Sequence, residues 1–376
     1  MYKLSVNELA GFEPDETLLV DVRDETSFAY GHVPGAINVA ANDACNYAFP
    51  RNKRLIVYCR TGLQSYDVVY ALREKGFDAY ELDGGYVAWL KLHIYDLARD
   101  TALQVEEGLR TRFSKKLFTK FAKAITTYRL LEPNDKVAVC ISGGKDSMLM
   151  AKLFQELKRH NKFPFELVFL VMDPGYSPAN REIIERNAKV LNVPITVFET
   201  DIFENVFNIE KSPCYICARM RRGHLYAKAK ELDCNKIALG HHYDDVIETT
   251  LMGMLYGGQM QTMMPRVDSS HFEGMRLIRP MYLIREDDIK AWRDYYNLQF
   301  IQCACKFTDT CSGDTCQSSN TGSKRKKVKE LIKMLKAEDP EIEQNIFKST
   351  ENVNLSTILA YKDKHGTKHY FWDDDE

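Results

Sequence analysis

Short apolar runs bounded by turn residues recur through the N-terminal part of the chain. Leu18–Val22 and Leu55–Tyr58 have the length and composition of buried strands, and a helical stretch follows the second of them. Further on, Asp83–Gly85 gives a turn signal before the apolar segment Tyr86–Leu90. This alternation of strands and helices predicts a small α/β domain with a largely parallel sheet.

Residues 105–131 show a different period. Apolar residues recur at steps of three and four, which predicts one amphipathic helix. They are Leu109, Phe113, Leu117, Phe121, Ala124 and Tyr128. Basic residues surround this stripe, and no acidic residue lies between positions 110 and 129. Two interpretations stay open, a solvated helix face and a surface that meets phosphate groups.

A second alternating pattern fills residues 134–300. Strands are expected at 136–141, 166–172, 195–199 and 236–239, with amphipathic helices between them. This pattern predicts a doubly wound parallel-sheet domain, with ligands at the carboxyl ends of its strands. A cysteine-rich segment and a last helical stretch follow. We therefore expect an α/β chain with a first domain over 1–95, a basic connecting helix over 96–131, the doubly wound domain over 132–300, and a tail over 301–376.

Composition places the chain among ordinary globular proteins. Its 376 residues are 45% hydrophobic and 28% charged, and its net charge of −2 gives no sign of nucleic-acid binding. No apolar run is long enough to cross a bilayer, and the N-terminus lacks the pattern of a signal peptide, so we expect no membrane association and a cytoplasmic location. Thiols stay reduced there, so the ten cysteines suggest metal binding or catalysis.

One cysteine stands where an anionic sulfur would be stabilised. Cys59 ends a predicted strand and opens the loop 59–65, whose backbone N–H groups can converge on its sulfur. Gly62 permits the tight path, and Ser65 is expected to cap the next helix. A lone strand-end cysteine is more often structural, but here its context is specific. Together, 19–23, 31–38 and 58–62 resemble the rhodanese family, which implies a sulfur-carrying role for Cys59.

A second loop suits the phosphates of ATP. It follows the predicted strand at 136–141 and opens a helix near Asp146. Its residues are Ser142, Gly143, Gly144, Lys145, Asp146 and Ser147. Glycines allow close approach to phosphate, the helix N-terminus supplies N–H donors, and Lys145 adds charge. The loop resembles that of ATP pyrophosphatases, the PP-loop enzymes, which cleave ATP to AMP and pyrophosphate. Asp173, at the end of the next strand, is expected to meet the nucleoside.

Two further groups of residues carry possible chemistry. Cys214 and Cys217 form a Cys-x-x-Cys pair that suits zinc, an iron–sulfur cluster or a redox disulfide, and spacing alone slightly favours zinc. His241, Asp244 and Asp245 follow a predicted strand and suit Mg²⁺, a nucleotide or proton transfer. A polar loop that merely caps the following helix is the plainer interpretation of the second group.

The chain from about 105 to 355 resembles the tRNA 2-thiocytidine synthetase family, most closely at 111–147, 214–225, 237–258 and 277–288. Members adenylylate the C2 oxygen of a cytidine in the tRNA anticodon loop, at position 32, and replace it with sulfur. They use a [4Fe–4S] cluster held by three cysteines. The resemblance therefore replaces zinc with this cluster and implies three ligands, Cys214, Cys217 and Cys303.

The sequence departs from that family at two places. Cys305 is a rival for the third ligand, and Cys311 and Cys316 leave room for a second metal site. An N-terminal rhodanese-like domain is also absent from the usual enzyme. Both departures bear on which base is modified more than on the chemistry.

The resemblances imply a complete reaction. A cysteine desulfurase or thiosulfate loads Cys59 with sulfur, ATP and Mg²⁺ bind the second loop, and sulfur passes through the cluster to tRNA. His241, Asp244 and Asp245 hold metal or manage protons, and a homodimer stays open. Alternatives are a 2-thiouridine or 4-thiouridine synthase, a PP-loop ligase of the lysidine-forming kind, and an iron–sulfur RNA-binding sensor whose loops have lost their activity.

Overall fold

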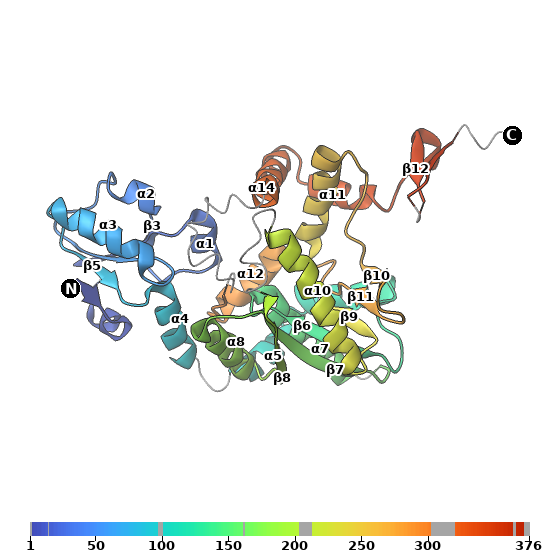
Figure 1. Cartoon of the computed structure of the whole chain (residues 1–376), viewed down its shortest axis with the longest axis horizontal. Coiled ribbons are helices and arrows are strands. Elements are labelled where there is room, and N and C mark those ends of the chain that lie inside the picture. The colour runs from blue at the N-terminus through green and yellow to red at the C-terminus, as the bar shows by residue number, and fades with distance from the viewer. Residues whose placement is uncertain are drawn as a thin grey trace. The chain divides into compact units, whose positions relative to one another are not determined.

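The computed structural model describes residues 2–13, 15–96, 101–160, 162–202, 213–301, 320–363 and 366–371 (Figure 1). The chain divides into two compact units. The first joins Met1–Tyr243 to Pro265–Asn320, and the second joins Asp244–Met264 to Thr321–Glu376. Within the described ranges, none of the helices combines the length and apolarity that crossing a membrane requires. The domain boundaries expected from the sequence stay a prediction.

The first unit begins with a five-stranded sheet in the order β1-β5-β4-β2-β3, and every strand pairing described in it is parallel. Its central strand β4 buries Leu55 to Tyr58 completely, as expected for a strand covered on both faces. The strands are β1 (Lys3–Leu4), β2 (Thr17–Asp21), β3 (Ile37–Asn38), β4 (Arg54–Tyr58) and β5 (Ala79–Leu82). The 3₁₀ helix η1 (Val6–Gly11) and the helices α1 (Glu25–Tyr30), α2 (Ala41–Ala44), α3 (Leu63–Glu74) and α4 (Gly85–Asp96) connect them. The small parallel α/β domain is confirmed.

A six-stranded sheet follows in the same unit, in the order β10-β11-β9-β6-β7-β8. Only the β10–β11 pair is antiparallel among the pairings described. The strands are β6 (Lys136–Ile141), β7 (Glu166–Asp173), β8 (Ile195–Glu199), β9 (Lys236–Ala238), β10 (Arg266–Asp268) and β11 (Arg276–Ile278). The accompanying helices are α7 (Lys145–His160), α8 (Pro178–Val190), α10 (Pro213–Glu231) and α12 (Glu286–Tyr295). The doubly wound architecture is confirmed.

The strand order creates a switch point beside β6. From β6 the chain moves outward through β7 to β8, and it then returns to the opposite side of β6 as β9. In open α/β sheets, ligands bind in the crevice at the carboxyl ends of the strands where this reversal occurs. The SGGKDS loop, residues 142–147, leaves the carboxyl end of β6 and therefore lies at this position.

The expectation of one regular helix over 105–131 is wrong. The structure has α5 (Thr101–Arg110), a π-helical turn η2 (Ser114–Phe118) and α6 (Thr119–Thr127). The apolar stripe is nevertheless buried from Leu109 to Ala124, and Tyr128 at its end is partly buried. Four-residue steps from Leu109 to Phe121 drift around a helix of 3.6 residues per turn, and a wider turn corrects this drift. The N–H of Phe113 accordingly bonds to the carbonyl of Gly108, five residues back.

The described part of the second unit consists of helices and one hairpin. Most of α11 (Tyr243–Gly257) belongs to it, together with α14 (Asn320–Glu338), α15 (Ile342–Ser349) and the short η3 (Leu355–Thr357). The strands β12 (Ala360–Lys362) and β13 (Lys368–Tyr370) pair antiparallel. Glu248 of α11 ties two of these helices together, because its carboxylate lies 3.5 Å from Arg325 Nε and 3.4 Å from Lys329 Nζ.

Candidate functional site

The Cys59 loop holds a sulfur atom inside a small cradle. Cys59 follows β4 directly and is only 2% exposed. The backbone N–H of Gly62 donates to its Sγ over 3.2 Å, and the Ser65 hydroxyl lies 3.5 Å from the same atom. Ser65 does not cap α3, as the sequence suggested, because Gly62 occupies that N-cap with a φ of +103°. Ser65 instead faces the thiol from the first turn.

The path of this loop is fixed from behind by α4. The N–H groups of Tyr86 and Val87 donate to the carbonyls of Cys59 and Arg60 over 2.9 Å and 3.1 Å. Gly85 makes this approach possible, since a Cβ there would lie 2.6 Å from the Cys59 carbonyl oxygen. The loop carbonyls thus point at a helix N-terminus, while an N–H and a hydroxyl point at the sulfur. Hydrogen-bond donors in this arrangement suit an acceptor at the position of the sulfur.

A buried acid lies on the far side of Ser65. The Ser65 hydroxyl is 3.3 Å from Glu81 Oε1, and Glu81 on β5 is 2% exposed. Burial raises the pKa of the Glu81 carboxyl, although Lys3, 3.7 Å from Oε2, opposes this effect. Sequence reasoning missed Glu81 because only the parallel pairing of β4 with β5 brings it near the cysteine.

The SGGKDS loop closes around the N-terminus of α7. Gly143 has a φ of +84°, and a Cβ there would lie 2.5 Å from Cγ1 of Ile184, so only glycine fits. Ser147 Oγ accepts from the N–H of Ser142 over 3.1 Å and donates to the Gly144 carbonyl over 2.9 Å. These hydrogen bonds fix the shape of the loop from within. Its N–H groups and the helix dipole favour a bound phosphate.

Charged side chains converge on this loop. The Lys145 ammonium, on a residue 3% exposed, lies 3.1 Å from Asp146 and 3.4 Å from Glu286. Nε2 of His242 is 4.0 Å from Asp146 Oδ1. Sequence reasoning singled out the neighbouring His241 and missed both His242 and Glu286. Glu286 begins α12, and no spacing in the sequence connects it to the loop.

The N-terminal domain reaches this loop through one tyrosine. The N–H of Lys145 donates to the hydroxyl oxygen of Tyr30 on α1 over 3.2 Å, and that hydroxyl lies 3.2 Å from the carbonyl oxygen of Ile301. Burial raises the pKa of Tyr30, so the phenol remains neutral and able to donate. A side chain of the N-terminal domain therefore accepts a hydrogen bond from an N–H group of the kind that binds phosphate.

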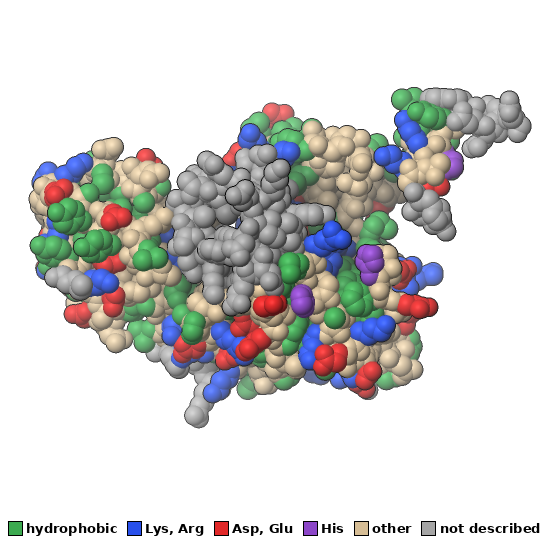
Figure 2. All heavy atoms as spheres, viewed as in Figure 1, with side chains coloured by type: hydrophobic (Ala, Val, Ile, Leu, Met, Phe, Trp, Pro, Cys, Tyr) green, Lys and Arg blue, Asp and Glu red, His purple; other side chains and the backbone are tan. Residues whose placement is uncertain are grey.

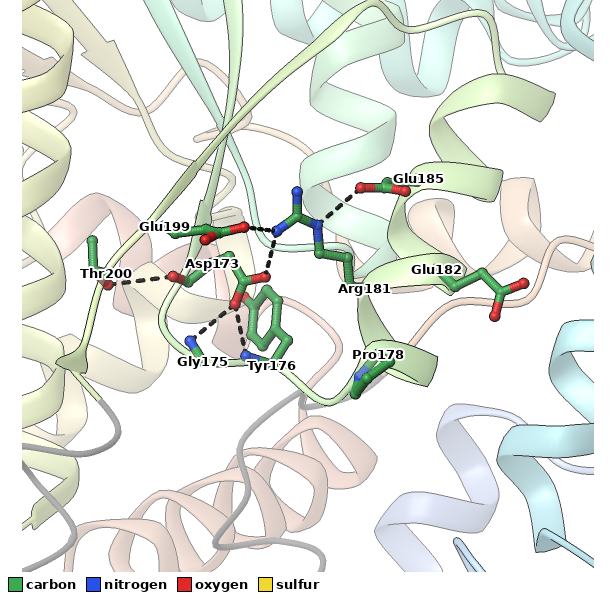
Figure 3. Close-up of a pocket in the computed structure, with 9 residues that line it drawn as sticks. All are labelled: Asp173, Gly175, Tyr176, Pro178, Arg181, Glu182, Glu185, Glu199 and Thr200. Carbon is green, nitrogen blue, oxygen red and sulfur yellow. Dashed lines mark hydrogen bonds and ion pairs between the residues drawn. The ribbon is translucent and has the colours of Figure 1, made fainter.

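A cavity of about 500 Å³ opens at the ends of β7 and β8 (Figure 3). Most of its lining comes from the strand ends and from the start of α8. The lining residues are Asp173, Gly175, Tyr176, Pro178, Arg181, Glu182, Glu185, Glu199 and Thr200. Acidic and basic side chains gather side by side over α8 in Figure 2. The cavity thus opens at the carboxyl end of β7, the strand that pairs with β6, and its size suits a small ligand such as a nucleoside.

Asp173 shapes the wall of this cavity. Its Oδ1 accepts from the N–H groups of Gly175 and Tyr176 over 2.9 Å and 2.6 Å, and its Oδ2 lies 3.1 Å from Arg181 (Figure 3). Hydrogen bonds to Glu185 and Glu199 raise the pKa of Arg181. The expected contact of Asp173 with a nucleoside stays a prediction. Its described contacts are with protein and hold the loop after β7.

The remaining acids expected at the site belong to α11. Asp245 Oδ1 lies 3.4 Å from Arg325 in the second unit. Burial raises the pKa of the nearby Glu248 to about 6, while Lys329 and Arg325 oppose the shift. His241 is half-buried, and Asp244 occupies the first turn of the helix. Roles for His241, Asp244 and Asp245 in metal binding or proton transfer stay predictions.

For the cysteines expected to bind the cluster, the structure describes no side chain. Cys214 and Cys217 belong to the first turns of α10, and nothing is described of their side chains. Cys303, its rival Cys305, and the pair Cys311 and Cys316 lie outside the described residues. Among the residues that are described, no three His, Cys, Asp or Glu side chains group as metal ligands.

Comparison with known proteins gives a family match for each of two domains of the chain. The PP-loop domain family model matches residues 111–306, and the rhodanese-like domain model matches residues 6–92. The chain is 32% identical over 251 residues to the tRNA-cytidine(32) 2-sulfurtransferase of Anaeromyxobacter dehalogenans (strain 2CP-C), covering 66% of this chain and 82% of that protein. It is 31% identical over 265 residues to the protein of the same name from Geotalea uraniireducens (strain Rf4), covering 69% and 99%. A solved structure, the U34-tRNA thiolase NcsA from Methanococcus maripaludis with its [4Fe-4S] cluster, aligns at 22% identity and a TM-score of 0.48, covering 62% of this chain and 76% of that chain.

Proposed function

We propose that this chain, which belongs to the PP-loop family and carries a rhodanese-like domain ahead of it, is an ATP-dependent tRNA sulfurtransferase that makes 2-thiocytidine. One observation carries the proposal. A cysteine cradled for an anionic sulfur and a loop shaped for pyrophosphate occur in one chain, and the curated relatives that match it thiolate cytidine 32 of tRNA. We take tRNA as the substrate and the C2 position of a cytidine as the target.

The first step activates the base. ATP binds with its phosphates against the SGGKDS loop, where the N–H groups of α7 and Lys145 offset their charge. The C2 oxygen of the cytidine attacks the α-phosphorus, a new P–O bond forms, and pyrophosphate leaves. This step is needed because oxide is a poor leaving group and AMP is a good one. Asp146 and Glu286 would offer carboxylate oxygens to Mg²⁺, which would supply positive charge to offset that of the phosphates.

The second step delivers sulfur. Cys59 is loaded as a persulfide by a cysteine desulfurase or by thiosulfate, and the Gly62 N–H and the Ser65 hydroxyl stabilise the anion. A thiol then attacks Cys59 Sγ, forms a disulfide with it and releases the outer sulfur as sulfide. The sulfide forms a bond to C2, the C2–O bond breaks, and AMP departs with the oxygen. A second thiol returns Cys59 to its reduced state.

A cluster would complete the sulfur path. Cys214, Cys217 and Cys303, with Cys305 as the alternative third ligand, would hold a [4Fe–4S] cluster that supplies an iron site open to sulfur. Spacing and family resemblance support this assignment. His241, Asp244 and Asp245 would manage protons or hold metal.

The substrate is tested in cells. Bulk tRNA from a strain that lacks this protein is digested and its nucleosides are compared with those of the parent strain by mass spectrometry. The proposal predicts that 2-thiocytidine disappears while other thiolated nucleosides persist, and that re-expression restores it. Loss of a thiouridine instead would show that the modified base is a uridine. An unchanged nucleoside profile would contradict a cytidine of tRNA as the substrate.

A further inference from the structure

An exposed apolar surface lies on the second unit. It is formed by Met254, Leu255, Tyr256 and Met260, whose exposed fractions range from 44% to 67%. We call these four residues the Tyr256 platform. Three of them are consecutive at the end of α11, where a polar end would be expected of a helix that faces only water. An exposed apolar surface of this kind marks a site where another molecule binds.

The backbone beneath this platform is held in one shape. The N–H of Gln259 donates to the carbonyl of Gly253 over 2.9 Å, and Gly258 takes a φ of +59° to allow this reversal. The hydroxyls of Thr250 and Thr262 are 3.0 Å apart and join the helix to the returning chain. A fixed backbone presents its side chains at low entropic cost to whatever binds them.

Positive charge accompanies the platform. Lys324 Nζ lies 5.2 Å from the centre of the Tyr256 ring. Lys326, Lys327 and Lys333 on α14 are exposed and, within the part of the chain that the structure describes, form no ion pair. Arg325 and Lys329 differ from them, because both face the acids of α11. Aromatic and apolar side chains beside unpaired cations match a strand that has stacking faces and a negative backbone.

We propose that the Tyr256 platform and the neighbouring lysines of α14 bind single-stranded RNA, with an unpaired base stacked on Tyr256 and phosphates beside Lys326 and Lys327. The inference rests on the proposed function, which supplies an RNA substrate whose target base lies in a loop. Proteins read such loops by stacking splayed bases on aromatic rings, whereas paired bases present no free face. The platform therefore selects unpaired RNA over duplex.

Binding of a fluorescein-labelled single-stranded RNA oligonucleotide to the full chain tests this proposal, with a blunt duplex RNA as the second probe. Fluorescence anisotropy gives the dissociation constants without ATP or a sulfur donor. Tyr256→Ala should weaken single-strand binding about tenfold, while Tyr256→Phe keeps the stacking face and binds like the parent. Tyr70→Ala removes a tyrosine on α3 that is more exposed than Tyr256, and it should leave binding unchanged. In the double variant Lys326→Gln and Lys327→Gln, the slope of the logarithm of the binding constant against the logarithm of the salt concentration should become less steep by about 0.7 for each lysine.

Several outcomes would overturn the proposal. Unchanged binding by Tyr256→Ala, or an equal loss with Tyr256→Phe, would exclude stacking on this ring. Sedimentation that shows a parent dimer and a Tyr256→Ala monomer would make the platform an interface between copies. Binding is measured apart from sulfur transfer, so the two proposals can fail independently. If Tyr256 proves not to bind RNA, the parent can still make 2-thiocytidine. Equally, RNA binding at Tyr256 can stand if the base or the reaction proves different.

Discussion

Gly85 lies so close to the carbonyl of Cys59 that a Cβ at this position would be 2.6 Å from its oxygen. The N-terminus of α4 can therefore reach the back of the Cys59 loop, and the Tyr86 N–H holds that carbonyl over 2.9 Å. With its carbonyls held from behind, the loop leaves the Gly62 N–H free to face the sulfur. The shape of the loop around Cys59 thus depends on Gly85, a residue of α4.

Gly85→Ala should damage sulfur loading more than it damages the fold elsewhere. Gly85 and Gly35 both have a positive φ, but a Cβ at Gly35 meets nothing within 4 Å. Gly35→Ala is therefore the matched control, and its backbone strain should cost about 1–2 kcal/mol. Gly85→Ala should lower the free energy of unfolding further and slow persulfide formation on Cys59, measured by mass spectrometry after thiosulfate treatment. Equal behaviour of the two variants would show that the contact with the loop is unimportant.

Lys145→Gln should abolish most pyrophosphate release. The ammonium is buried between Asp146 and Glu286, and without it these carboxylates repel the phosphates of ATP. We expect a fall in the rate of pyrophosphate release of about a hundredfold. Lys290→Gln is the control, because Lys290 also pairs with Glu286, over 3.3 Å, but lies on the surface of α12. A Lys145→Gln rate near that of Lys290→Gln would contradict phosphate binding by this loop.

Tyr30→Phe should strengthen ATP binding. The Tyr30 hydroxyl holds the Lys145 N–H, which a phosphate oxygen would otherwise accept from. Removing the hydroxyl frees that donor, so the dissociation constant for ATP should fall by about threefold, the value of one modest hydrogen bond. Tyr86→Phe removes a comparable hydroxyl that bonds to Gln299 over 3.1 Å and should leave ATP binding unchanged. An unchanged or weaker affinity in Tyr30→Phe, measured by calorimetry, would exclude this competition.

Glu248→Gln should change how stability depends on pH. Burial raises the pKa of Glu248 from 4.5 to about 6, so the folded chain holds this proton more tightly than the unfolded chain does. Ionisation of Glu248 therefore lowers stability as pH rises through this window. Glutamine does not ionise, and the free energy of unfolding of the variant relative to the parent should rise across the window by up to about 2 kcal/mol.

Denaturant melts below and above the window measure this difference for Glu248→Gln. Glu330→Gln, at an exposed position on α14, is the control and should show no such trend. A difference between Glu248→Gln and the parent that stays constant with pH would show that Glu248 ionises normally in the folded chain.

Much of the fold could be predicted because its signals are local. The buried strands at 54–58 and 136–141 are nearly continuous apolar runs, and the loops that follow them carry specific glycines. The resemblances to the rhodanese and PP-loop families are confirmed by the matches over 6–92 and 111–306. The π-helical turn at 114–118 was missed because the same apolar spacing fits an ordinary helix.

The contacts around the sites could not be predicted, since they join residues distant in sequence. Glu81 reaches Ser65 only through sheet pairing, and Glu286 reaches Lys145 across 141 positions. Tyr30 meets the SGGKDS loop from a separate sheet's domain. Motifs identify which loops carry chemistry, and long-range packing decides which buried acids and hydroxyls surround them.

Thiolation of cytidine by this chain should require both the sulfur held on Cys59 and the energy of ATP. Anaerobically prepared protein is incubated with ATP, Mg²⁺, thiosulfate, a thiol reductant and tRNA that lacks 2-thiocytidine, and the digested tRNA is analysed by mass spectrometry. The parent and Cys45→Ser should make 2-thiocytidine only when ATP is present, with release of pyrophosphate, and Cys59→Ser should make none. Formation at the parent's rate by Cys59→Ser, or by the parent without ATP, would contradict this requirement.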